Sequence, residues 1–292
     1  MARTTLRHTD AVNKKIIFVA DAFRKDFLGG GECNDNVLIS HLNSLEYSVQ
    51  IIKCLELQSD DLNQNNFFIV GNFISLSEKN KKLLQKEDYI IYEHDHKYIK
   101  SRDPSVYKNF IAPSDHIINH DFYKHAKAVV VLSGICKEIL EKNLNIDNVY
   151  NIGCSLWANK KLDFIEALIS REKNEKFAIL ASSNPIKNTY EAVAYCETNN
   201  IPFDVIEPCG EEELLTKLSS YKGLVFFPKV LETFSRLSAE AKMLNCKLLT
   251  KPKMLGFASE EIYKLSGEEL IEQIRRRKLD ALSLFVSFIE GR

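Results

Sequence analysis

The sequence has no run of about 18 apolar residues, the length that a helix needs to cross the hydrocarbon core of a bilayer. It has seven cysteines but no Cys-x-x-Cys pair, and this odd, scattered set indicates reduced thiols. Residues 1–13 are polar and lack the apolar centre of a secretory signal peptide. We therefore expect a cytoplasmic protein without a membrane span.

Charge of one sign is also lacking, because the net charge of the 292 residues is only −1. No global field attracts the chain to nucleic acid or to a membrane, although a local basic patch is still possible. The dinucleotide motif Gly-x-Gly-x-x-Gly is missing too, although residues 29–31 form a run of three glycines. A hydrophobic fraction of 45% provides a large core, and the length suggests two domains.

Short apolar runs alternate with amphipathic runs along nearly the whole chain. This alternation predicts parallel sheets covered by helices on both faces. The predicted strands are 15–20, 47–53, 67–70, 89–92, 128–132, 149–152, 177–181, 203–206, 224–227 and 247–250. The predicted helices are 33–45, 135–143, 189–198, 211–219, 234–244, 267–277 and 279–289. We expect an α/β protein with two Rossmann-like domains, 14–155 and 156–292, that face a cleft, with a last helix able to pack back on the first domain.

Two glutamates bracket the start of one predicted helix. Glu232 lies in the loop after the strand 224–227, and Glu240 lies eight residues further on, inside the helix. Thr233 or Ser235 could cap that helix through a side-chain oxygen. The free N–H groups of its first turn form a natural phosphate site, and Arg236 could add a cation there. The spacing suits a sugar at one carboxylate, a ribose at the other and a diphosphate between them, although it could also arise by chance.

The residues around this pair read as strand, Pro228, Glu232, seven residues, Glu240-Ala241, short helix and apolar strand. The pattern resembles the C-terminal signature of the retaining GT-B glycosyltransferases, the family-4-like group, and looks like the small members common in bacteriophage and marine microbial genomes. It departs in Ser235, where a glycine is usual. The resemblance implies that Glu232 contacts the donor sugar, Glu240 contacts the ribose, and the residues that hold the diphosphate are Thr233, Phe234, Ser235 and Arg236.

Further donor-site residues follow from the same resemblance. Lys187 matches a lysine that grips the donor phosphates in the family, although a lysine at a helix start can also be an ordinary surface residue. The arginine that the family usually has a few residues earlier is absent, and Ser183 is among the residues in its place. A glycine-rich loop of the family lines the cleft, and the matching residues are Gly29, Gly30 and Gly31, which could otherwise form only a flexible turn.

Two histidines follow the predicted strand 89–92. The family places a histidine near here against the transferred sugar, and either His94 or His96 could take this role. A metal site built from both histidines and Asp95 is the alternative, with His116, His120 and His125 as more distant ligands. The resemblance implies no cofactor and a metal-independent reaction, and the Asp-x-Asp metal motif of the other large glycosyltransferase fold is missing.

The acceptor stays open at this point. A basic stretch with interleaved tyrosines could hold an acidic acceptor such as DNA, or could be an ordinary solvated loop; its cations are Lys97, Lys100 and Arg102. The resemblance implies transfer of a hexose or pentose from a nucleotide sugar, with UDP favoured, to a hydroxylated cytosine of phage DNA or to a surface glycan. The alternatives are a nucleotide-sugar-binding protein without transferase activity and a sugar-nucleotide epimerase or hydrolase.

Overall fold

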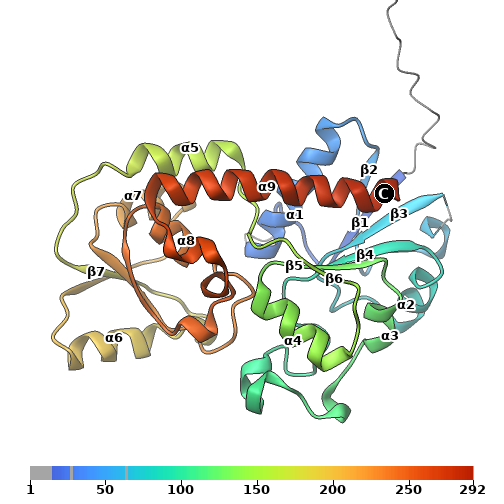
Figure 1. The fold of residues 1–292 in the computed structure, drawn as a ribbon, viewed down its shortest axis with the longest axis horizontal. Helices are drawn as coiled ribbons and strands as arrows, with labels where there is room; N and C mark the ends of the chain where they lie inside the picture. The colour runs from blue at the N-terminus through green and yellow to red at the C-terminus, as the bar shows by residue number, and fades with distance from the viewer. Residues whose placement is uncertain (1–14, 27–28, 63–64, 292) are drawn as a thin grey trace, which may run out of the picture.

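The computed structural model describes residues 15–26, 29–62 and 65–291, and in them two parallel sheets lie side by side, as Figure 1 shows. The first sheet has the order β2-β1-β3-β4-β5-β6 and the second has the order β10-β9-β7-β8. The strands are β1 (Lys15–Ala20), β2 (Val49–Lys53), β3 (Asn66–Val70), β4 (Asp88–Tyr92), β5 (Ala128–Val131), β6 (Val149–Asn151), β7 (Phe177–Leu180), β8 (Phe203–Ile206), β9 (Gly223–Phe226) and β10 (Lys247–Thr250).

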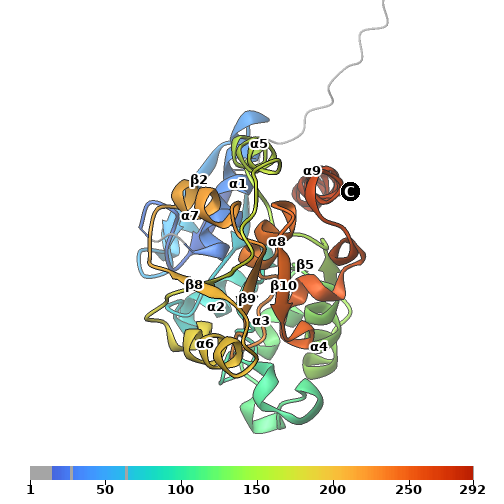
Figure 2. The ribbon, with the colours of Figure 1, turned by 90° about the vertical axis from the view of Figure 1, so that its left-hand side faces the viewer.

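Each predicted strand is present, with ends that shift by at most two residues. The central strands are apolar at successive positions because helices cover both faces of a parallel sheet. β5 is buried at all four positions, and β1 is buried at five of six. In Figure 2, β8, β9 and β10 lie between α6 on one side and α7 and α8 on the other.

The helices are α1 (Gly30–Ser44), α2 (Glu78–Leu84), α3 (His120–Lys124), α4 (Gly134–Leu144), α5 (Asn159–Leu168), α6 (Thr189–Thr198), α7 (Glu211–Leu218), α8 (Arg236–Met243) and α9 (Gly267–Glu290). The sequence reading missed α2, α3 and α5. It also divided α9 in two, which was wrong. The helix continues through Lys278, which lies between the two predicted helices. Lys278 is buried and bonds to Asn159 of α5. No helix in the described ranges is long and apolar enough to cross a membrane.

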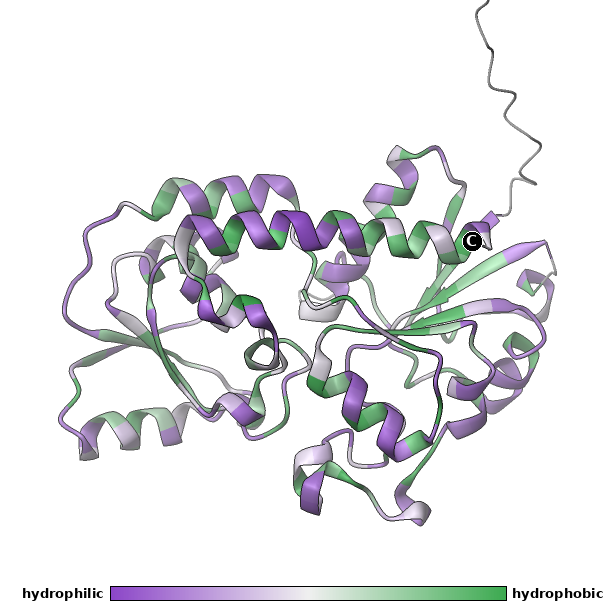
Figure 3. Ribbon diagram, in the orientation of Figure 1, coloured by the Kyte–Doolittle hydropathy of each residue, from purple (hydrophilic) through white to green (hydrophobic). Residues whose placement is uncertain are grey.

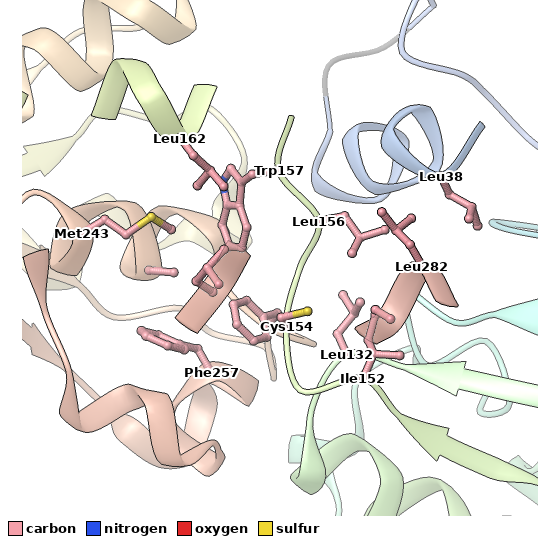
Figure 4. Packing of buried hydrophobic residues seen from close by; sticks show 14 of the residues in the cluster. Leu38, Leu132, Ile152, Cys154, Leu156, Trp157, Leu162, Met243, Phe257 and Leu282 are labelled. Atoms are coloured by element: carbon pink, nitrogen blue, oxygen red, sulfur yellow. The ribbon is translucent and has the colours of Figure 1, made fainter. Parts of the chain in front are cut away.

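One hydrophobic cluster joins the two halves of the molecule. Figure 4 shows Leu38, Leu132 and Ile152 on the side of the first sheet and Trp157, Met243 and Phe257 on the side of the second. Cys154 and Leu156, in the connection between the sheets, fill the space between them. The connecting segment is therefore part of a continuous core.

Helix α9 spans both halves. It packs against α5 and α8 on one side and against α1 on the other, and Figure 1 shows it running over the top of the molecule. Near its end, Phe285 meets the Tyr92 ring at 4.8 Å between centroids, and Phe288 meets Tyr150 at 4.9 Å. Figure 3 shows both green and purple residues along α9, in keeping with one buried and one solvated side. The sheets fall on either side of the predicted boundary at 155/156, while the last helix belongs to both halves.

Candidate active site

A cavity of about 490 Å³ lies between the two halves. The first half contributes the start of α1 and the loop after β4, and the second half contributes β7, β9 and the start of α8. The cavity brings together residues far apart in sequence: Gly29, Gly30, Gly31, His94, Lys161, Lys187, Glu232, Thr233, Phe234, Ser235, Arg236 and Glu240. Most of the residues predicted to bind a donor therefore line one space.

The loop that carries Glu232 is held by the first half of the chain. On one side of Glu232, Leu231 is buried in the core of the first sheet, and its N–H donates to Asp103 Oδ1 at 3.2 Å. On the other side, Thr233 Oγ1 donates to the carbonyl oxygen of His94 at 3.2 Å. Since both neighbours of Glu232 are fixed, the position of its carboxylate depends on how the two halves pack.

Glu232 is paired with Lys187 inside the cavity. Lys187 Nζ lies 2.8 Å from Glu232 Oε1 and 5.8 Å from the centroid of the Phe226 ring. Lys187 ends a short 3-10 helix whose start is capped by the Asn184 side chain. Ser182 lines the cavity, whereas Ser183, which was predicted to bind the donor, is exposed and not among the described lining residues.

The glycine run differs from the predicted loop. Gly30 and Gly31 are the first residues of α1, and Gly29 is its N-cap, with φ of −106°. Their lack of side chains matters for space, because a Cβ on Gly31 would lie 3.2 Å from the His94 ring. Phe27 and Leu28, which precede them, lie outside the described residues.

Helix α8 starts at Arg236, not at Phe234 as predicted. Ser235 is its N-cap in the left-handed conformation, with φ of 76°, where a glycine would be unstrained. The expected side-chain cap is not present in this described segment, because Ser235 Oγ bonds to Ser238 Oγ at 2.8 Å. Arg236 and Leu237, in the first turn, line the cavity, and the first N–H groups of a helix have no partner within the helix and favour an anion.

Arg236 connects the second half to the first. Its Nη1 donates to Asn34 Oδ1 at 3.1 Å, to Ser155 Oγ at 2.8 Å and to the carbonyl of Leu156 at 2.6 Å. Its guanidinium carbon lies 4.5 Å from the Trp157 ring centroid, a cation–π arrangement. The predicted phosphate cation is therefore also an interdomain contact.

Glu240 is a buried carboxylate with two donors on one oxygen. Trp157 Nε1 donates to its Oε1 at 2.8 Å and Lys161 Nζ at 2.6 Å. Burial by itself would raise the pKa of the Glu240 carboxyl, but Lys161, Arg236 and the Trp157 bond outweigh it and hold this pKa below its usual value. Glu240 therefore stays ionised and can accept hydrogen bonds from hydroxyl groups.

His94 lines the cavity and is held by Asp35 of α1. His94 Nε2 lies 2.8 Å from Asp35 Oδ1, and both side chains are almost completely buried. The Tyr92 ring packs on the imidazole at 4.2 Å between centroids. Among the described residues, none bonds to His94 Nδ1.

His96, the other candidate, is buried outside the described cavity lining. Its Nδ1 lies 3.1 Å from Tyr98 Oη, and its backbone is left-handed with φ of 51°. Burial lowers the pKa of His96 to about 4, so the ring is neutral at physiological pH. Of the two predicted histidines, His94 is the one that the fold brings to the cavity.

Lys97 does not belong to an exposed basic loop, and this part of the acceptor prediction needs correction. Lys97 Nζ is buried and lies 2.7 Å from Glu93 Oε1 and 3.2 Å from Asn72 Oδ1. The charge is compensated inside the first domain and is not available to an acceptor. Lys100 and Arg102 are exposed, and Arg102 pairs with Asp95.

The metal alternative gains no support from the side-chain positions. His94 bonds to Asp35, Asp95 pairs with Arg102, and His96 bonds to Tyr98, so the three side chains have three different partners. The described ranges contain no group of three or more His, Cys, Asp or Glu side chains able to hold a metal ion.

Sequence reasoning missed several residues that build the site: Asn34, Ser155, Trp157, Lys161 and Glu211. Lys161 lies on α5, a helix that the sequence did not predict, and no spacing relates it to Glu240 in the sequence. Trp157 is the single tryptophan of the chain, which was the one available signal.

No protein-family model matches the sequence, and no curated protein matches it. Among solved structures, HepE of Anabaena in complex with UDP and glucose is similar, with 11% identity, a TM-score of 0.55 and coverage of 94% of this chain and 100% of that one. HepE with UDP is similar at 12% identity and a TM-score of 0.50, over 91% of this chain and 90% of that one. An α-glucosyltransferase in complex with UDP and a 13-mer DNA containing an HMU base has 10% identity and a TM-score of 0.48, over 92% of this chain and 91% of that one. The chain therefore has the GT-B fold, in which two parallel α/β units face a shared cleft.

Proposed function

We propose that this protein is a glycosyltransferase that moves a sugar from a nucleotide-sugar donor, with a UDP-sugar favoured, to an acceptor hydroxyl with retention of configuration. The observation that carries the proposal is an interdomain cavity whose lining includes two carboxylates, a helix N-terminus and a lysine. These groups are Glu232, Glu240, the start of α8 and Lys187.

The donor is proposed to lie along this row of groups. Glu240 accepts from the ribose hydroxyls, and the N–H groups of α8 together with Lys187 meet the diphosphate. Glu232 and His94 face the transferred sugar. The apolar lining from β7 and α7, which includes Leu180 and Leu214, leaves space for the base. In this pose Lys187 exchanges its contact with Glu232 for a phosphate oxygen.

The reaction breaks the bond between the anomeric carbon and the β-phosphate oxygen and forms a bond from that carbon to the acceptor oxygen. The acceptor hydroxyl attacks from the side of the departing phosphate, and its proton passes to the diphosphate. Lys187 and the α8 N-terminus stabilise the negative charge that develops on the leaving group, which is the main electrostatic contribution. No protein carboxylate acts as a nucleophile.

The first experiment is a panel of UDP-, GDP- and ADP-sugars, read by thermal shift and by release of nucleotide. Stabilisation with release of nucleoside diphosphate supports the proposal, and we expect it to persist in EDTA because the reaction is proposed to need no metal. Stabilisation without turnover with any acceptor would favour a binding protein. Release of free sugar without an acceptor would favour an epimerase or hydrolase.

The second experiment identifies the acceptor and the stereochemistry. DNA containing hydroxymethylated pyrimidines and a set of surface-glycan fragments are offered with the preferred donor, since both acceptor classes remain candidates. The anomeric configuration of the product is then measured by NMR. An inverted product would exclude the retaining mechanism while leaving the transferase assignment intact.

A further inference from the structure

Residues 254–260, which we call the brace, run beside the loop that carries Glu232. The Glu232 N–H donates to the carbonyl of Met254 at 3.0 Å, and the Glu232 carbonyl accepts from the Gly256 N–H at 2.8 Å. A parallel bridge pairs Glu232 with Leu255. Both backbone polar groups of Glu232 are therefore bonded to the brace, which fixes the backbone of a residue that lines the cavity.

The brace packs against this loop without spare room. A Cβ on Gly256 would lie 2.1 Å from the carbonyl oxygen of Thr233 and 2.5 Å from Ser133 Oγ, so only glycine fits there. Next to it, the Phe257 N–H donates to the carbonyl of Phe234 at 2.8 Å, and the centroids of the two rings are 5.2 Å apart. Because groups packed this closely cannot move independently, a shift of the brace shifts the loop.

The far end of the brace is held by the first half of the molecule. Glu260 Oε1 accepts from the Gly134 N–H at 2.7 Å and from Asn151 Nδ2 at 3.0 Å. Ser259 Oγ accepts from the Ile135 N–H at 3.1 Å. Gly134 and Ile135 begin α4, whose own N-cap side chain makes no capping bond. Two side chains of the second half therefore supply the acceptors that this helix start needs.

The surroundings of Glu260 require a carboxylate. Its Oε2 accepts from Arg277 Nη1 at 2.7 Å, and its side chain is only 8% exposed. The same Nη1 donates to the carbonyl of Gly153 at 2.9 Å. Gly153 has φ of 62°, and a Cβ there would lie 2.7 Å from Glu260 Oε2. Since the groups of Arg277, Gly134 and Asn151 are all donors, the NH₂ group of a glutamine would meet another donor.

We propose that Glu260 is a positioning residue, which pins the brace to α4 and thereby holds the backbone of Glu232 in a fixed position relative to the first half. Glu260 is not among the described residues that line the cavity, so it acts on a bound sugar only through the Glu232 loop. The effect on sugar transfer rests on the proposed transferase function, whereas the pinning of the loop does not.

Hydrogen exchange measured by NMR on the ligand-free protein tests the pinning directly. Glu260→Gln should raise the exchange rates of the Glu232 and Gly256 amides by roughly tenfold or more, the change expected when a buried hydrogen bond to a charged group is lost. Each protein is measured at the same interval below its own Tm, so that a global loss of stability does not enter the comparison. Unchanged exchange at both amides would overturn the proposal.

The matched control is Glu166→Gln. Glu166 of α5 lies 2.9 Å from Arg275 of α9, so this variant also removes a carboxylate from an arginine of α9, but outside the brace. Its exchange rates at the two amides should equal those of the wild type, and an equal rise there would refute a local role of Glu260. Ser259→Ala is a second variant in case Glu260→Gln does not fold. It removes the acceptor of the Ile135 N–H and should raise exchange at the same two amides.

Kinetics then test what the pinning does. Glu260→Gln should lower kcat by roughly 10- to 100-fold, because a displacement of about 1 Å can cost about 100-fold in rate, and should leave the Kd of UDP within about twofold. UDP is proposed to contact Glu240, Lys187 and the start of α8 rather than Glu232. In a Glu232→Ala background, the same change should have no further effect on kcat. Equal losses in both backgrounds would overturn the positioning role.

The failures of the two proposals are distinguishable. If sugar transfer occurs and neither the exchange rates nor kcat respond to Glu260→Gln, the positioning role is refuted and the transferase function stands. If no sugar nucleotide reacts with the wild type, the proposed function fails together with the effect on kcat, and the exchange rates still decide the pinning.

Discussion

Replacement of Lys187 by alanine tests the donor site most directly. Lys187 contacts one carboxylate, Glu232, at 2.8 Å, and its side chain is 39% exposed. An ion pair this exposed contributes only about 0–1 kcal/mol to stability. The same lysine would make a charge-assisted hydrogen bond to the diphosphate, which is worth about 1.5–3 kcal/mol.

The two magnitudes separate folding from binding. Lys187→Ala should change the free energy of unfolding by less than about 1 kcal/mol, yet raise the Kd of UDP by roughly 10- to 150-fold. The variant also leaves the Glu232 carboxylate uncompensated beside the phosphates. Adding Glu232→Gln should therefore recover part of the lost UDP affinity, because like charges near each other repel.

The chain offers a closely matched control for this measurement. Lys251 lies in the same half, 2.5 Å from Glu191 and 5.8 Å from the Phe227 ring centroid, but it does not line the described cavity. Calorimetry with UDP and urea unfolding should show that Lys251→Ala has the same small effect on stability and none on affinity. Equal losses of affinity in Lys187→Ala and Lys251→Ala, or none in either, would refute the assignment of Lys187.

Three further predictions concern other parts of the site. Trp157→Phe removes the N–H that bonds to Glu240 at 2.8 Å, so the affinity for UDP should fall. The Tm in a thermal-shift assay should drop by about 2–4 °C, the size expected for one hydrogen bond. An unchanged Tm and an unchanged affinity would contradict the role of Trp157 in holding Glu240. The pKa of His96 is lowered from 6.5 to about 4, so between these pH values the unfolded chain binds a proton at this histidine and the folded chain does not. The free energy of unfolding should therefore fall by up to about 1.4 kcal/mol per pH unit from pH 6.5 towards pH 4. Urea titrations of His96→Gln should lack this part of the pH dependence. Gly31→Ala places a Cβ 3.2 Å from the His94 ring and should slow sugar transfer, while the Kd of UDP stays within about twofold. Steady-state kinetics measure the transfer rate, and calorimetry measures the Kd. An unaltered kcat would show that the His94 ring has room to move.

Local patterns determined most of the secondary structure. The run 15–20 is apolar at successive positions and can be stable only between two layers of helices, which is how β1 is found. The positions of Pro228, Glu232 and Glu240 likewise predicted a loop followed by the start of a helix. Proline ends the strand before it, and the left-handed Ser235 precedes the helix, and both effects are set by local sterics. These signals depend on neighbours in the chain, so one sequence is enough to read them.

The sequence-based predictions were wrong or incomplete where a residue's surroundings depend on long-range contacts. Lys97 looks like part of a basic loop, yet Glu93 and Asn72 compensate its charge in the core. Asp35 gave no signal at all, since its partner His94 is 59 positions away. Burial and pairing of a charge are decided by residues that only the packed domain brings close.

The acidic pair shows both contributions. The sequence by itself determined that Glu232 and Glu240 flank a helix N-terminus, because helix starts are set locally by a handful of residues. Only the tertiary structure decided that Leu231 is anchored in the first domain, that Trp157 and Lys161 hold Glu240, and that Asp35 holds His94 within the first domain. The contact of Leu231 with Asp103 joins residues 128 positions apart, and it forms because the two α/β units bury a common core.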